Sequence, residues 1–182
     1  MAVVKQLILG GARSGKSRLA EKLAVQSGLE VTYIATATAN DKEMQRRIEQ
    51  HRDRRPSHWG LVEEPFALAQ VLGLHAGHGR LLLVDCLTLW LSNLICREQP
   101  VELRRELDAL LEILPDLPGE IILVSNEVGM GIVPMGELCR QFQDEMGLLQ
   151  QRIAERCERV VVTLAGLPLV LKPAGTYLSM ED

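Results

Sequence analysis

One short motif constrains this chain more than any other feature of its sequence. Residues 10–17 read GGARSGKS, which matches the pattern G-x-x-x-x-G-K-S. An apolar run, residues 3–9, precedes the motif, and the pattern of residues 17–27 predicts a helix after it. Strand, glycine loop and helix in this order form a cradle in which backbone N–H groups surround phosphate oxygens. A chance glycine-rich turn is the alternative, but the elements on both sides favour a nucleotide triphosphate site.

Two side chains of the motif and one beyond it are candidates for the chemistry of a triphosphate. Lys16 can reach the β- and γ-phosphates, and the Ser17 hydroxyl can bind Mg²⁺. Asp85 ends the apolar run LLLVD, and a carboxylate at the carboxyl end of a strand can hold the Mg²⁺ shell. Asp85 also precedes a predicted helix, so helix capping is its alternative role. The predicted nucleotide-binding residues of the motif are Gly10, Gly11, Ala12, Arg13, Ser14, Gly15, Lys16 and Ser17.

Short apolar segments alternate with longer helical ones along the chain. This alternation predicts an α/β fold with a mostly parallel sheet, helices on both faces and a C-terminal antiparallel hairpin around Ala165 and Gly166. We expect a single nucleotide-binding domain over residues 1–182, with residues 176–182 as a flexible tail. The predicted strands span residues 3–9, 31–35, 81–85, 120–125, 160–164 and 167–171, and the predicted helices span residues 17–27, 41–54, 66–74, 87–97, 100–114 and 138–157.

Composition argues against several other classes of protein. The formal net charge is −4, so the basic surplus typical of a nucleic-acid-binding protein is missing. The most apolar stretch, residues 81–96, is shorter than the roughly 20 residues that a membrane helix needs. The cysteines form no CxxC pair, and we expect them to be small core residues. We therefore expect a soluble, cytoplasmic protein with no nucleic-acid partner and no stable membrane insertion. The cysteines are Cys86, Cys96, Cys139 and Cys157.

A charged segment, residues 41–55, contains a second candidate for chemistry. Met44, Ile48 and His51 are spaced by four and then three residues, so they share one face of the predicted helix. Arginines four residues before and after His51 disfavour its charged form, and a neutral imidazole can attack phosphorus. A half-buried structural histidine is the more common alternative for such a position. On the residues alone, both roles of His51 remain open.

The segment after the predicted strand 120–125 is a third candidate. It reads SNEVGMGIVP over residues 125–134, with polar residues at the strand end followed by two glycines. Glu127 is placed like a base or a nucleotide-binding group, and Gly129 and Gly131 allow a ligand to approach the backbone closely. An ordinary strand-to-helix loop is the alternative.

Three segments together resemble a known family. They are GGARSGKS, RRIEQHRDRRPSHW over residues 46–59, and SNEVGMGIVP. The chain resembles the bifunctional adenosylcobinamide kinase/adenosylcobinamide-phosphate guanylyltransferases from Val3 to about Lys172. The phosphate loop is shared widely, whereas R-P-x-H-W and N-E-V-G-M-G are much more specific. The resemblance implies a RecA-like P-loop fold, typically assembled as a homotrimer.

The resemblance also implies an activity in the assembly of the cobalamin nucleotide loop. Such enzymes phosphorylate adenosylcobinamide with ATP or GTP. They then transfer GMP from GTP to adenosylcobinamide phosphate, which gives adenosylcobinamide-GDP and pyrophosphate. The transfer passes through a GMP–histidine phosphoramidate, and His51 aligns with the histidine that forms it.

Two departures from relatives in this family bear on the site. Some relatives have two adjacent histidines where this chain has Gln50 and His51, and we align the second with the nucleophile. Some have Glu in place of Asp85, so the shorter side chain here leaves direct and water-mediated contact with Mg²⁺ both open. Two other functions compete: a plain P-loop small-molecule kinase in which His51 is structural, and a nucleotide-switch module with no small acceptor.

Overall fold

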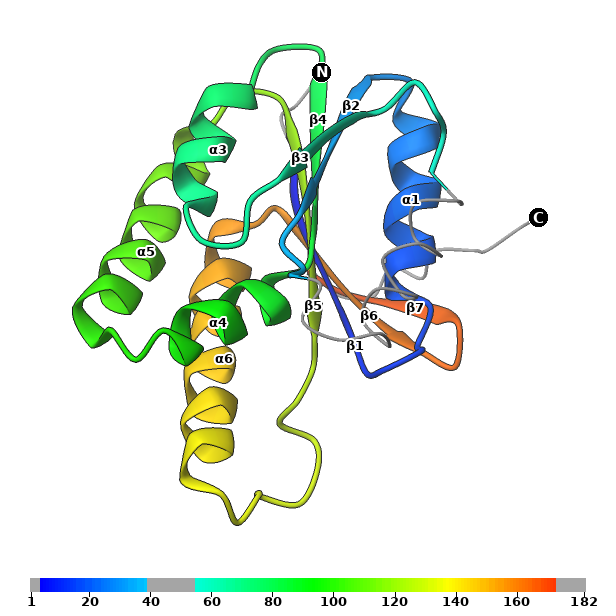
Figure 1. The fold of residues 1–182 in the computed structure, drawn as a ribbon. Helices are drawn as coiled ribbons and strands as arrows, with labels where there is room; N and C mark the ends of the chain where they lie inside the picture. Colours follow the sequence, from blue (N-terminus) through cyan, green and yellow to red (C-terminus); the bar gives the residue numbers. More distant parts are fainter. Residues whose placement is uncertain (1–3, 39–54, 173–182) are drawn as a thin grey trace.

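The computed structural model describes residues 4–38 and 55–172. These residues form one seven-stranded sheet in the order β3-β2-β4-β5-β1-β6-β7 (Figure 1). Every neighbouring pair is parallel except β6 and β7, which confirms the predicted mostly parallel sheet with a terminal antiparallel hairpin. The strands are β1 (Lys5–Gly10), β2 (Glu30–Ala35), β3 (Gly60–Glu63), β4 (Arg80–Asp85), β5 (Glu120–Asn126), β6 (Arg159–Leu164) and β7 (Leu167–Lys172).

Helices cover both faces of this sheet, as predicted. Helix α1 lies on one face, and α3, α4, α5 and α6 lie on the other (Figure 1). The glycine predicted to end α1, Gly28, has the left-handed φ of 66° that favours this residue after a helix. A proline, Pro100, begins α5, where its missing N–H costs nothing. The helices are α1 (Lys16–Ser27), α3 (Leu68–His75), α4 (Leu87–Cys96), α5 (Pro100–Ile113) and α6 (Glu137–Arg156), and a 3₁₀ turn spans Leu114–Asp116.

Alternation along the central strands divides the core in two. On β4, Leu82 and Val84 belong to the cluster under α3–α6, whereas Leu81 and Leu83 belong to the cluster under α1. A strand buried on both faces has to be apolar at every position, which explains the continuous run that ends at Asp85. Because side chains alternate, Asp85 lies on the α1 side, where the phosphate loop (residues 10–17) begins the helix.

One strand, β3, was not predicted from the sequence. Strand β3 pairs with β2 at the edge of the sheet, has only four residues and is largely exposed. Such a strand has neither the length nor the apolar run by which buried strands are recognised. By contrast, the predicted hairpin turn is present: Ala165 and Gly166 have φ values of 52° and 84°, the paired positive angles of a tight two-residue turn.

The cysteines divide into two pairs, so the prediction that all are core residues is wrong for two of them. Cys86 and Cys157 are buried, whereas Cys96 and Cys139 are exposed, and all four are free thiols. Burial raises the pKa of Cys86 to about 11 and that of Cys157 to about 12, which keeps both thiols protonated at neutral pH. In the parts of the chain that the structure describes, no helix combines the length and apolar character of a membrane span.

Candidate active site

The phosphate loop turns tightly between β1 and α1. Its turn is closed by the Ser14 N–H, which donates to the Gly11 carbonyl at 3.2 Å. Three residues have positive φ, Gly10 at 159°, Arg13 at 57° and Gly15 at 98°, and Gly15 is the residue from which α1 starts. The N-terminus of α1, whose first N–H groups have no acceptor within the helix, therefore lies at the end of the loop, where it can bind an anion. The predicted strand, loop and helix are all present.

Gly10 leaves no room for a side chain. A Cβ atom there would overlap the hydroxyls of Ser14 and Thr163 and would lie 2.8 Å from the Thr163 carbonyl oxygen. The first glycine of the motif is therefore required because the loop folds back directly over the end of β1.

The hairpin of β6 and β7 supports the loop through contacts that were not predicted from the sequence. Thr163, which is 1% exposed, shares a hydrogen bond of 2.7 Å with the Ser14 hydroxyl and donates to the Leu9 carbonyl at 3.2 Å. At the tip, the Gly166 N–H donates to the Ser14 carbonyl at 3.0 Å. A threonine at the carboxyl end of an otherwise apolar strand was the available signal. These bonds fix the loop before any ligand arrives.

Lys16 and Asp85 are brought together at one edge of the sheet, as predicted. The Lys16 ammonium donates to the Gly11 carbonyl at 3.2 Å. Burial lowers the pKa of Lys16, and the nearby Cys86 and Asp85 groups oppose this shift by favouring the charged form. The site thus holds a partly desolvated cation opposite a carboxylate, an arrangement that a bound polyphosphate would complement.

The Asp85 carboxylate is held by a neighbouring strand rather than by the helix that follows it. The Tyr33 hydroxyl, on β2, donates to Asp85 Oδ2 at 3.0 Å. Thr36 fixes the next backbone unit, because its hydroxyl donates to the Cys86 carbonyl at 2.7 Å and accepts from the Cys86 N–H at 2.9 Å. The N-cap of α4 is Cys86, with no side-chain capping bond, so the geometry gives no support to a capping role for Asp85.

The residues predicted to bind Mg²⁺ have suitable chemistry. Ser17, in the first turn of α1, and Asp85, at the end of β4, offer the hard oxygen ligands that this ion prefers. Among the described residues there is no cluster of three or more His, Cys, Asp or Glu side chains that would form a metal cage. A site of two protein oxygens fits an ion that takes its other ligands from phosphates and water.

Glu127 lies beside the phosphate loop, but its carboxylate is engaged locally. Its backbone N–H donates to the Gly10 carbonyl at 3.1 Å, which extends the pairing of β5 with β1. Its side chain accepts from the N–H groups of Gly129 at 2.6 Å and Met130 at 3.2 Å. Glu127 therefore lies at the edge of the site, where it was predicted, and its carboxylate holds the backbone of the loop that follows.

His51 lies outside the described residues, together with the rest of segment 39–54. The described chain resumes at Arg55, whose guanidinium stacks over the Tyr33 ring at 4.2 Å from its centroid. Tyr33 is the residue whose hydroxyl donates to Asp85. The segment that contains His51 therefore joins a residue anchored next to the phosphate site. Among the other histidines, His58 and His78 are exposed, and His75 ends α3 on the opposite face of the sheet.

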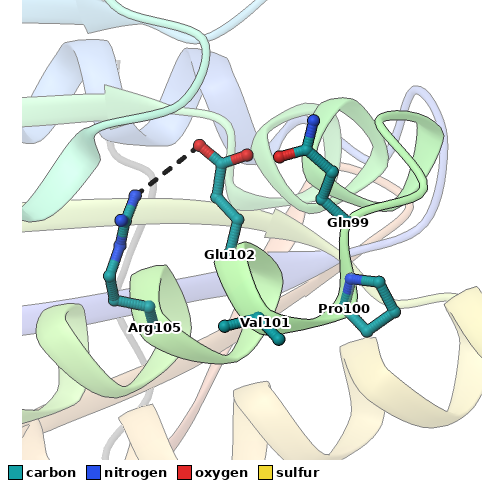
Figure 2. A pocket seen from close by; sticks show the side chains of 5 residues that line it. All are labelled: Gln99, Pro100, Val101, Glu102 and Arg105. Atoms are coloured by element: carbon teal, nitrogen blue, oxygen red, sulfur yellow. Dashed lines mark ion pairs between the residues drawn. The ribbon is translucent and has the colours of Figure 1, made fainter.

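A cavity of about 470 Å³ lies elsewhere, at the start of α5. Figure 2 shows the Arg105 guanidinium directed at Glu102, 3.6 Å away, beside Gln99, Pro100 and Val101. Helix α5 covers the face of the sheet opposite α1, so this cavity is remote from the phosphate loop (Figure 1). The two charged residues that line this cavity, Glu102 and Arg105, form an ion pair with each other.

Comparison with known proteins identifies the family of this chain. The family model described as cobinamide kinase / cobinamide phosphate guanyltransferase matches residues 6–171. The chain belongs to this family. It is 64% identical over 93% of its length to the bifunctional adenosylcobalamin biosynthesis protein CobP of Pseudomonas aeruginosa, 98% of which is covered. It is 36% identical over 91% of its length to the bifunctional adenosylcobalamin biosynthesis protein CobU of Escherichia coli, again covering 98% of that protein.

Solved structures of other proteins share the fold of this cobinamide kinase / cobinamide phosphate guanyltransferase. A Pyrococcus horikoshii protein, PH0250, superposes with a TM-score of 0.58 at 10% identity, with 98% of this chain and 94% of that chain covered. A type III secretion system ATPase superposes with a TM-score of 0.56 at 13% identity, over 87% of this chain and 51% of that chain. The predicted P-loop α/β fold and the predicted enzyme family are both confirmed.

Proposed function

We propose that one phosphate loop serves both reactions of this family, phosphorylation of adenosylcobinamide and guanylyl transfer to its phosphate. The observation that carries this proposal is the juxtaposition of Lys16, Ser17 and Asp85 around a loop braced by Thr163 and Gly166. The braced loop offers one preorganised place for a triphosphate. Both reactions use a nucleoside triphosphate, one cleaved at its γ-phosphorus and the other at its α-phosphorus.

In the kinase reaction, the hydroxyl of adenosylcobinamide attacks the γ-phosphorus in line, and the bond from the γ-phosphorus to the bridging oxygen breaks. The product is adenosylcobinamide phosphate, and the nucleoside diphosphate leaves. The Lys16 ammonium offsets charge on the β- and γ-phosphates, and the N–H groups at the start of α1 contact the phosphate oxygens. Ser17 and Asp85 would hold Mg²⁺, which supplies charge neutralisation and orients the phosphates when bound.

In the transferase reaction, the neutral imidazole of His51 attacks the α-phosphorus of GTP. A P–N bond forms, the bond from the α-phosphorus to the β-bridging oxygen breaks, and pyrophosphate leaves. An oxygen of adenosylcobinamide phosphate then displaces the imidazole and gives adenosylcobinamide-GDP. The support is the family membership together with Arg55, four residues after His51, which stacks on Tyr33 beside Asp85. Four residues of extended chain span at most about 14 Å.

Labelling with GTP tests this assignment directly. Incubation of the purified protein with [α-³²P]GTP should leave one label per chain that is labile in acid and stable in alkali, as a phosphoramidate is. A plain kinase or a nucleotide-switch module would leave no covalent label, so the same experiment separates the proposal from both alternatives.

Substitution of Asp85 tests the proposed Mg²⁺ site. Asp85→Asn keeps an oxygen that can accept the Tyr33 hydroxyl bond, so the fold should persist. Loss of the carboxylate charge should raise the Mg²⁺ concentration needed for half-maximal rate by about tenfold and lower both activities. The measurement is a Mg²⁺ titration of each reaction, with Asp108→Asn on α5 as the control. A Mg²⁺ dependence equal to that of the wild type would remove Asp85 from the metal site.

We further propose that the enzyme is a cytoplasmic homotrimer. The trimer rests on the family resemblance, and light scattering coupled to gel filtration should give a mass near three times that of the 20.2 kDa chain. A monomer at micromolar concentration would contradict it. The cytoplasmic location is supported by two exposed free thiols, Cys96 and Cys139, which persist in a reducing compartment.

Glu127 remains a proposed nucleotide-binding residue because of its contact with Gly10.

A further inference from the structure

Asn126, the last residue of β5, lies between the phosphate loop and Asp85. Strand β5 runs between β4 and β1, and Asn126 pairs in register with Gly10. Side chains at every second position of a strand lie on the same face, so the Asn126 side chain lies on the face of Ile122 and Val124, which belong to the core cluster under α1. Asp85 pairs with Val124, so Asn126 is two residues beyond Asp85 on the same face of the sheet. Asn126 lies within the N-E-V-G-M-G segment, but the proposed chemistry gives it no role.

The backbone of Asn126 is held from the opposite face. Its N–H donates to the Thr88 hydroxyl at 2.7 Å, and its carbonyl accepts from the Gln150 amide at 2.7 Å. These partners belong to α4 and α6, on the far side of the sheet. With both backbone groups engaged there, the backbone of Asn126 is held in place and its side chain stays on the α1 side of the sheet.

The carboxamide oxygen of Asn126 is buried and, in residues 4–38 and 55–172, has no hydrogen-bond partner. A buried acceptor that lacks a donor destabilises a folded protein, and such groups in native structures mark a ligand or an ordered water. Here the group lies at the carboxyl ends of β4, β5 and β1, where ligands of parallel α/β sheets bind. A carboxamide offers a donor and an acceptor side by side, which suits a phosphate oxygen next to a hydroxyl or water.

We propose that Asn126 binds the γ-phosphate end of the nucleotide. Its amide N–H donates to a γ-phosphate oxygen, and its carbonyl oxygen accepts from the hydroxyl or water next to that phosphate. The proposal rests on the triphosphate site in the phosphate loop. It adds a residue that distinguishes a triphosphate from a diphosphate, because a diphosphate has no γ-phosphate for Asn126 to bind.

The test compares binding of a non-hydrolysable ATP analogue with binding of ADP. In Asn126→Ala, the dissociation constant of the ATP analogue should rise by about tenfold or more, the effect of one lost hydrogen bond to a charged group, while that of ADP should change by less than about twofold. Without nucleotide, the melting temperature should stay the same or rise, because an unpaired buried acceptor has been removed. A residue with only a structural role would instead lower it.

A matched control and a second substitution complete the test. Gln6 is 5% exposed, and its Nε2 is also buried without a partner in the described chain, but it lies near the other end of β1. Gln6→Ala should leave the ratio of the two dissociation constants unchanged. Asn126→Asp, of nearly the same size, should weaken binding of the ATP analogue more than Asn126→Ala because a carboxylate repels the γ-phosphate.

The possible outcomes distinguish a failure of this inference from a failure of the proposed function on which it rests. If the wild type binds the ATP analogue tightly and Asn126→Ala keeps the wild-type ratio of dissociation constants, then water alone satisfies the carboxamide and the inference is wrong. If the wild type binds neither nucleotide, the proposed triphosphate site itself is wrong, and the inference falls with it. A preference for the ATP analogue over ADP that is weaker in Asn126→Ala than in the wild type, and weaker still in Asn126→Asp, supports the inference.

Discussion

Lys16→Ala should lower the kinase and the guanylyltransferase rates together, each by about a thousandfold or more. The reason is that electrostatic neutralisation of the triphosphate is the main contribution of a protein to phosphoryl transfer, and both reactions use the same loop in our proposal. The folded protein should tolerate the change. Burial lowers the pKa of Lys16, which means that the ammonium is partly desolvated before nucleotide binds, and its removal relieves that penalty.

Initial rates of both reactions, measured at saturating nucleotide and on the same protein preparation, check this expectation. Lys172→Ala is the matched control, because this exposed lysine at the end of β7 contacts the carbonyls of Ala154 and Glu155 and lies away from the loop. If one activity of Lys16→Ala stayed near the wild-type rate while the other was lost, the two reactions would need separate phosphate sites.

The local part of the site could be predicted because its geometry is written in adjacent residues. The glycines, Lys16 and Ser17 lie in one continuous segment, and the apolar run before them and the helix pattern after them fix its context. Asp85 was predicted from the same kind of signal, a polar residue that ends a buried strand. In a parallel sheet all such strand ends meet at one edge, so strand prediction alone brings Asp85 near the loop.

The supporting contacts could not be predicted, because they depend on strand order and register. Thr163 is 149 residues from Ser14 along the chain, and nothing in either local sequence selects the other. Tyr33 reads as an ordinary aromatic residue of a buried strand until β2 is placed beside β4. Asn126 becomes significant only when β5 is found between β4 and β1.

The short edge strand β3 and the division of the cysteines were missed for a related reason. Burial at these positions is decided by which element packs on them, and local hydrophobicity does not give that information. Cys96, at the end of an apolar helix, is exposed, whereas Cys157, next to a charged residue, is buried in the hydrophobic core. Sequence pattern therefore predicts the elements better than it predicts the tertiary surroundings of single residues.

His51→Ala should separate the two activities. Phosphorylation of adenosylcobinamide by ATP should continue at a substantial rate, because its acceptor hydroxyl attacks the γ-phosphorus directly and residues 10–17 are intact. GMP labelling of the protein and formation of adenosylcobinamide-GDP should fall below detection, because guanylyl transfer requires a nitrogen nucleophile. The measurements are the [α-³²P]GTP label on the chain and the rate of each product. His58→Ala is the control, because this exposed histidine lies seven residues further along the same motif and should be dispensable for both.

The pH dependence of labelling gives a second, independent reading of the same residue. Only the neutral imidazole has a free lone pair, so labelling of the wild type should weaken as falling pH protonates the ring, while the kinase reaction should not show this loss. A His51→Ala protein that still captured GMP would show that another side chain is the nucleophile, and His58→Ala would then be the variant that loses the label. If neither variant lost it, no histidine of the R-P-x-H-W region would be the acceptor. The kinase rate measured in parallel decides whether a lost label means a lost nucleophile or a lost nucleotide site, since the latter would abolish both.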